Sequence, residues 1–206
     1  MRSTITAICL AAGTLVSAQE LKLKGNESGI ISLGGRSSMS FFNDGGGGRG
    51  TGVGGQFRIR LAPRVTTDWF YDYFTSPVGD LVHRQDQHIG WNVGFYVRPL
   101  GEERQVVQPY VLAGHCFDYT RQQANRDRSL SIERWSSAAQ AGLGTHFNLS
   151  DRTDISLVGQ YMIHLGTDVH AHVHDGEVEF HKEKGGSLEG HLLFHLSFNY
   201  KLFDAW

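Results

Sequence analysis

The sequence has few cysteines, which often stabilise a small exported domain, and few long apolar runs, which form membrane helices. It contains only 2 cysteines in 206 residues, and Cys9 lies in an N-terminal segment that we expect to be removed. Cys116 then remains alone, so no intramolecular disulfide can form. After this segment, no apolar run approaches the roughly 18 residues that a membrane helix needs. Any location in a membrane therefore requires a β-barrel.

Strong net charge is also absent. The formal net charge is −2, and no Lys/Arg cluster stands out, which argues against a nucleic-acid partner. With 26 glycines and only 4 prolines, the composition is typical of many short strands and turns. We expect one domain built almost entirely from strands.

The first 18 residues have the features of a secretory signal peptide. Arg2 precedes an apolar run over residues 5–16, and small residues at Val16, Ser17 and Ala18 form a cleavage site before Gln19. A buried N-terminal helix is the alternative, but the run is too short to span a bilayer and nothing charged follows its start. We therefore assign 1–18 to the signal and 19–206 to a barrel domain whose strands begin at about residue 27.

The last segment, residues 190–202, predicts a long strand with two unlike faces. One parity is apolar and the other is mostly polar, with Leu193 as the exception. The apolar row is Leu192, Phe194, Leu196, Phe198, Tyr200 and Leu202. A strand of this kind fits a lipid phase on one side and a wet interior on the other.

Seven further segments are expected to be strands, and six of them alternate in the same way. They cover residues 29–42, 53–61, 65–75, 88–98, 106–120, 139–149 and 154–164. Long loops are expected at 43–51, 76–87, 121–134 and 166–187, separated by short turns, as in outer-membrane barrels. The segment 106–120 alternates too poorly for its facing to be assigned. The predicted fold is all-β, an eight-stranded antiparallel up-and-down transmembrane barrel.

In this pattern the chain resembles the small eight-stranded outer-membrane barrels of the OmpA and OmpX type. Its overall sequence pattern looks like that of the short barrels of Bacteroidota. The resemblance covers about residues 27 to 206 and depends on pattern, not on a diagnostic motif. It implies an integral protein of the bacterial outer membrane, in contact with its lipids and lipopolysaccharide and inserted by the barrel assembly machinery. A monomer without a periplasmic peptidoglycan-binding domain is expected.

A soluble lipocalin-like barrel would alternate as well, but with its apolar row inside. Eight strands enclose an interior only just wide enough for side chains. The aromatic row would overfill it with Phe57, Trp91, Phe95, Phe147, Tyr161, Phe194 and Phe198. We therefore expect these residues to face lipid.

The polar parity then lines the barrel, and its charges must pair or stay hydrated. It collects Arg36, Arg58, Arg60, Arg98, Lys201, Asp68, Asp72, Asp154, Gln56, Asn92, Gln140, Gln160, His88, His146, His164, His191 and His195. Arg58 or Arg60 lies opposite Asp68 across the turn at Pro63. We expect a hydrogen-bonded plug, with a narrow solute path as the alternative.

The last loop contains the one cluster of residues whose side chains are typical metal ligands. Asp175-Gly176 predicts a two-residue turn, which pairs imidazoles and carboxylates on one face: His174 with Glu177, His172 with Glu179, and His170 with His181. These six residues could bind a divalent metal such as Zn, Cu or Ni, or form cross-strand His–Glu pairs only. No other cofactor is expected. Extending the register inward pairs Gln160 with His191 and Ser156 with His195, as one continuous ribbon.

Nothing in the sequence predicts catalysis. Outer-membrane lipid A deacylases place a His-x-Ser pair on a late strand, whereas His164 is followed by Leu165 and Gly166. The other Ser, His and acidic residues have no spacing that predicts a triad. We expect a non-enzymatic protein with a structural or surface-interaction role, and a narrow porin or small-solute binder as the alternative.

Overall fold

The computed structural model describes residues 28–42, 48–98, 105–166, 168–174, 177–183 and 190–205. The expected signal peptide, the turn at 99–104, the hairpin tip at Asp175-Gly176 and Trp206 lie outside the described residues. The strands are β1 (Ile30–Phe42), β2 (Arg49–Ala62), β3 (Val65–Val78), β4 (Val82–Tyr96), β5 (Val107–Ala124), β6 (Ser131–Asn148), β7 (Thr153–Leu165), β8 (Asp168–His174), β9 (Glu177–Glu183) and β10 (Gly190–Asp204).

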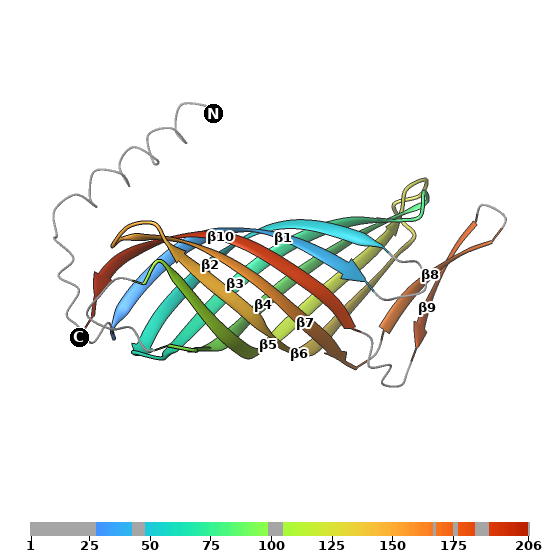
Figure 1. Ribbon diagram of the computed structural model, residues 1–206. Helices are drawn as coiled ribbons and strands as arrows, with labels where there is room; N and C mark the ends of the chain where they lie inside the picture. Colours follow the sequence, from blue (N-terminus) through green and yellow to red (C-terminus); the bar gives the residue numbers. More distant parts are fainter. Residues whose placement is uncertain are drawn as a thin grey trace, which may run out of the picture.

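Eight of these strands close into a barrel, in the order β1-β10-β7-β6-β5-β4-β3-β2, while β8 and β9 form a separate two-stranded sheet at one end (Figure 1). Every neighbouring pair is antiparallel, and β1 closes the barrel on β10, with Leu33 opposite Tyr200. The predicted eight-stranded antiparallel barrel is confirmed. Within the described ranges, no helix is long and apolar enough to cross a membrane.

The two faces of each barrel strand have opposite chemistry. Large apolar side chains lie on the outside, where Trp91 is 39% exposed and Phe198 is 52% exposed. All seven aromatic residues that a lipocalin-like barrel would place inside are on this outer surface. An apolar outer face with a polar interior is the arrangement that a bilayer requires.

Besides the last predicted long loop, where a hairpin was expected, two of the other three are mostly strand. Residues 76–87 were expected to be a loop, but β3 continues to Val78 and β4 begins at Val82, with Gly79 at φ +56° in the turn. Similarly, most of the expected loop 121–134 belongs to β5 and β6. Above the bilayer both faces of a strand are wet, so polar residues occupy both parities and the period-two pattern disappears. The short turn expected after the fourth strand falls on residues 99–104, outside the described residues, between the end of β4 at Tyr96 and the start of β5 at Val107.

The barrel wall is unequal in height. β5 and β6 each have 18 residues, whereas β1 and β7 have 13. About 9–11 tilted residues suffice to cross the hydrocarbon, so β5 and β6 continue well beyond it. The β8–β9 hairpin lies at the same end of the barrel as the β5–β6 turn (Figure 1). We take this end, opposite the first residues of β1 and the last of β10, as the extracellular one.

Candidate functional site

The candidate site is the barrel interior together with the hairpin at its outer mouth. All the residues predicted to face inward are buried except Arg98. Arg98 is exposed because β4 ends at Tyr96, after which strand parity no longer determines facing. The facing of β5, left open by its sequence, is now defined. Its inward residues are Gln108, Tyr110, Leu112, Cys116, Asp118, Thr120 and Gln122.

An ion network centred on Arg58 crosses the lower interior. The Arg58 Nε lies 2.7 Å from Asp68 Oδ1, which confirms the predicted pair on β2 and β3. Its Nη1 lies 3.1 Å from Asp154 Oδ1 on β7, and its Nη2 donates to Ser156 Oγ at 3.1 Å. One guanidinium thus joins two walls of the barrel that are far apart in sequence. A fork of donors can satisfy two buried carboxylates in this way.

An aromatic group lies toward the periplasmic end. The Arg60 guanidinium is 4.8 Å from the Tyr96 ring centroid, and its Nη2 donates to the Tyr96 hydroxyl at 3.1 Å. Tyr110 stacks on His146 with centroids 4.4 Å apart. Gly144 provides the space for Tyr110, because a Cβ there would be 2.8 Å from Tyr110 Cε2. The rings therefore fill the lower interior in a fixed arrangement.

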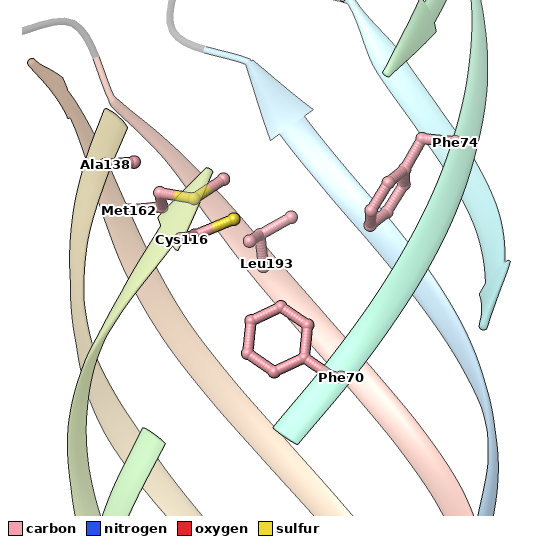
Figure 2. Close-up of a cluster of buried hydrophobic side chains, with 6 residues drawn as sticks. All are labelled: Phe70, Phe74, Cys116, Ala138, Met162 and Leu193. Atoms are coloured by element: carbon pink, nitrogen blue, oxygen red, sulfur yellow. The ribbon is translucent and has the colours of Figure 1, made fainter. Parts of the chain in front are cut away.

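Between the two ends, apolar side chains meet across the lumen. Figure 2 shows Phe70, Phe74, Cys116, Ala138, Met162 and Leu193, contributed by β3, β5, β6, β7 and β10. The Arg36 guanidinium lies 4.6 Å from the centroid of the Phe70 ring. We did not predict this layer, although the signal was present, since Leu193 is the one residue that breaks the alternation of its strand. This layer also contains a buried ion pair, because Arg36 Nε lies 3.0 Å from Asp72 Oδ1, and Asp72 is the inward residue between Phe70 and Phe74 on β3.

Above this layer, Asp118 is the centre of a second polar cluster. Its carboxylate lies 3.3 Å from His88 Nε2, 3.0 Å from His164 Nδ1 and 3.1 Å from Arg134 Nη2. His164 Nε2 is in turn 3.2 Å from His191 Nε2.

One choice of tautomers satisfies these hydrogen bonds while the His164 and His191 rings are neutral. His164 donates from Nδ1 to Asp118 and accepts at Nε2 from His191. His191 Nδ1 then accepts from the Ser40 hydroxyl at 3.4 Å. These hydrogen bonds connect β5, β7, β10 and β1 across the barrel interior.

The extracellular hairpin has the register that the sequence predicts. His170 is opposite His181, His172 is opposite Glu179, and His174 is opposite Glu177. Of the six predicted metal ligands, Glu177, Glu179 and His181 have described side chains, and all three are exposed. The described residues contain no group of three His, Cys, Asp or Glu side chains placed to hold a metal ion.

The predicted continuous ribbon is wrong. Gln160 pairs with Leu193 and Ser156 with Ser197, two residues away from the expected partners His191 and His195. The cause is the unequal length of the two linkers: β8 follows β7 after residues 166–167, whereas residues 184–189 separate β9 from β10. A shift of two keeps the parity, so the histidines of β10 still face inward.

The hairpin contacts the tall side of the barrel. Gln122 of β5 donates from Nε2 to the carbonyl of Val169 at 3.1 Å, and Val169 is only 3% exposed. Val178 of β9 lines a hollow together with Leu81, Ala124 and Leu130. The hairpin therefore contacts the outer rim through Val169 and Gln122, beside a hollow that apolar and charged side chains line together.

One polar pair lies on the lipid-facing surface, and sequence reasoning missed it because the facing of β5 was unknown. His115 Nε2 of β5 lies 2.6 Å from Ser137 Oγ of β6, and both residues are partly buried. Just above them, Tyr119 and Trp135 pack with ring centroids 4.8 Å apart. His115 is the only ionisable outward residue between Val107 and Phe117 on β5. Hydrogen bonding to Ser137 reduces the cost of a polar side chain in lipid.

Comparison with solved structures agrees with this geometry. Neisserial surface protein A is similar with a TM-score of 0.56 at 12% identity, over 86% of this chain and 99% of that one. The outer-membrane protein OprG from Pseudomonas aeruginosa has a TM-score of 0.52 at 16% identity, over 87% and 98%. The N-terminal β-barrel domain of OprF, from the same organism, has 0.51 at 13%, over 86% and 98%.

No family model matches the sequence, and no curated protein matches it. At these identities the solved structures show the fold alone, which is that of the small transmembrane barrels of the outer membrane. Together with the apolar outer face, this fold is that of an integral outer-membrane protein.

Proposed function

We propose that this chain is a non-conducting outer-membrane barrel whose role is to hold its extracellular hairpin and turns at the cell surface for contact with other molecules. The observation that carries the proposal is the apolar layer around Phe70 and Leu193 (Figure 2), which is contributed by five strands. It lies between the Arg58 network and the Asp118 cluster. An ion that passed through would have to lose its hydration among these packed side chains.

Conductance in planar bilayers tests this proposal. The refolded protein should give no discrete steps, whereas reproducible unitary steps would favour the alternative of a narrow channel. A variant with F70A, M162A and L193A removes much of the apolar layer and serves as the matched comparison. It should conduct if that layer is the barrier. Heat-modifiable migration on gels checks that the variant is folded, and F70A alone is the fallback if it is not.

The surface role is supported by the docking of the hairpin on the outer rim, through Gln122 and the hollow around Val178. A hairpin packed in this way presents one face outward in a defined orientation. Pull-down from intact cells, comparing the complete chain with one whose residues 167–189 are replaced by a Gly/Ser linker, tests whether this region is the contact surface. A partner retained by both chains would contradict the assignment.

A second candidate function is chemistry on lipid esters, favoured by the His115–Ser137 pair alone. The pair lies within reach of outer-leaflet lipid, and a serine hydrogen-bonded to an imidazole is the basic unit of acyl transfer. Ser137 Oγ would attack the ester carbonyl carbon as its proton passes to His115 Nε2. The carbon–oxygen bond then breaks, and the alcohol leaves with that proton. Water would hydrolyse the acyl-serine, releasing the fatty acid and restoring the hydroxyl.

Free fatty acid release from lipopolysaccharide and phospholipid vesicles tests this second candidate. S137A should abolish the release, whereas S131A, outside the pair, should leave it unchanged. Equal release by S137A and the unmodified protein, or none by either, would exclude the reaction.

A further inference from the structure

We infer that the hollow between the β8–β9 hairpin and the barrel rim binds a free α-amino acid with an apolar side chain. Three segments line this hollow, which are the β3–β4 turn, the β5–β6 turn with the end of β5, and the start of β9. Its volume is about 280 Å³, close to the lower end of the roughly 300–1,000 Å³ of small-ligand pockets. The inference goes beyond the proposed function, because it requires neither a closed lumen nor a macromolecular partner.

One part of the lining is aliphatic. Leu81, Ala124, Leu130 and Val178 contribute it, and they come from all three segments. The Leu130 side chain is 47% exposed, so a ligand in the hollow can remove apolar surface from water. The hollow therefore favours a ligand with an apolar body.

The other part of the lining carries both signs of charge. Arg126 contributes a guanidinium, and Asp127 and Glu177 contribute carboxylates. All three residues are exposed, so a ligand from solution can reach them. A guanidinium binds a carboxylate through two parallel hydrogen bonds, and a carboxylate accepts hydrogen bonds from an ammonium group. An apolar amino acid has the two charges and the apolar body that this lining complements.

The wall on the barrel side is held in place by hydrogen bonds between the two turns. Asn125 donates from Nδ2 to the carbonyl of Asp80 at 3.0 Å, and from its backbone N–H to the carbonyl of Leu81 at 2.8 Å. Within the β5–β6 turn, the backbone N–H of Leu130 donates to the carbonyl of Asp127 at 3.1 Å. A ligand therefore meets a wall that is already formed, which reduces the ordering that binding requires.

The hairpin supplies the opposite wall through Glu177 and Val178, the first two residues of β9. Asp127 Oδ1 already accepts two hydrogen bonds from Ser129. We therefore assign the ligand's ammonium group mainly to Glu177 and its carboxylate to Arg126. A ligand bound in this way connects the rim to the hairpin.

Methyl NMR titration of the refolded full chain in lipid nanodiscs is the test. L-leucine should shift the methyl signals of Leu81, Leu130 and Val178, which line the hollow, and leave those of Leu196 on the lipid-facing surface unchanged. Isoamylamine lacks the carboxylate of leucine, and 4-methylpentanoate lacks its ammonium group, so each should bind about 5-fold more weakly. Signals in the hollow that stay unshifted up to the solubility limit of leucine would overturn the site. An analogue that binds as tightly as leucine would overturn the choice of an amino acid.

Two variants test the assigned contacts. R126Q should weaken the binding of leucine about 5-fold and leave that of isoamylamine unchanged, because the amine has no carboxylate. E177Q should weaken leucine to a similar extent and leave 4-methylpentanoate unchanged. The matched control E133Q removes an exposed carboxylate of β6 that does not line the hollow, and it should bind leucine as the unmodified protein does. Undiminished binding of leucine by R126Q or by E177Q would contradict the assignment, and heat-modifiable gel migration shows that each variant is folded.

Discussion

The part of the barrel inside the membrane and the part that projects beyond it follow different rules. Within the membrane, each strand separates lipid from a polar interior, so Phe198 and Asn199 on β10 lie in opposite surroundings. On the outer extension, both faces of β4 are polar, with Arg84 and Asp86 inside and Gln85 and Gln87 outside. Alternation in the sequence therefore shows which part of a strand lies in the bilayer, and does not show how long the strand is.

The same contrast applies to ion pairs. Inside, the Arg58 and Asp68 side chains are buried, and the pair is extended by Asp154. Outside, Arg121 and Glu133 lie 3.5 Å apart with side chains 39% and 51% exposed. A buried charge that loses its partner has no water to replace it, whereas an exposed one does.

The largest effect should therefore come from R58M. It leaves Asp68 and Asp154 buried without their shared cation, and we expect a loss of about 3–5 kcal/mol in the free energy of unfolding. The matched variant R121M removes the exposed pair and should cost less than about 1 kcal/mol. Urea unfolding in lipid vesicles, followed by tryptophan fluorescence, measures both. Similar losses for the two variants would show that the interior is hydrated enough to screen its charges.

A smaller effect should separate an inward glycine from an outward one. In G144V the new side chain would meet Tyr110, which is held against His146 and cannot easily move. We expect a loss of about 1–3 kcal/mol, as for other overpacked cores. G35V is the control, because a Cβ there meets nothing within 4 Å. The same unfolding measurement applies, and an equal loss in both variants would point to the strand backbone instead of the ring.

The sequence predicted correctly those features that depend on residues close together along the chain, such as a strand with one apolar and one polar face. The facing of β10, the Arg58–Asp68 pair and the register of the hairpin around its Asp-Gly turn all depend on local rules, and all are confirmed. The facing of β5 could not be predicted, because both of its faces carry apolar residues. Leu112 and Cys116 lie inside, and Val111 and Phe117 lie outside. Only the neighbouring strands determine which side is lipid.

Features set by distant segments could not be predicted in this way. The apolar layer forms because Phe70 and Met162, far apart in sequence, meet only after the barrel closes. The His115–Ser137 bond requires the register of β5 on β6, which places Ser137 diagonally across from His115, whose direct partner is Ala139. The offset between the hairpin and β7–β10 depends on linker lengths, which alternation does not report.

The smallest predicted effect concerns the outermost turn, where water surrounds every group. Asp127 Oδ1 accepts hydrogen bonds from the Ser129 hydroxyl at 2.7 Å and from the Ser129 backbone N–H at 2.9 Å. These bonds favour the carboxylate, and they lower the pKa of Asp127, the hydroxyl contributing most. A carboxyl with a lowered pKa stabilises the folded turn at pH above its ordinary pKa, and this contribution is lost as the pH falls through the lowered value.

The variant S129A keeps the backbone donor and removes the hydroxyl, so the pKa of Asp127 should rise part of the way toward its usual range. Carboxyl carbon shifts in an NMR pH titration of the protein in detergent measure this directly. S131A, outside the bonded turn, should leave the titration of Asp127 unchanged. An unchanged Asp127 in S129A would mean that the backbone N–H alone organises the turn. In either case the barrel stability should stay constant, because a fully exposed turn contributes little to a fold whose ties lie inside.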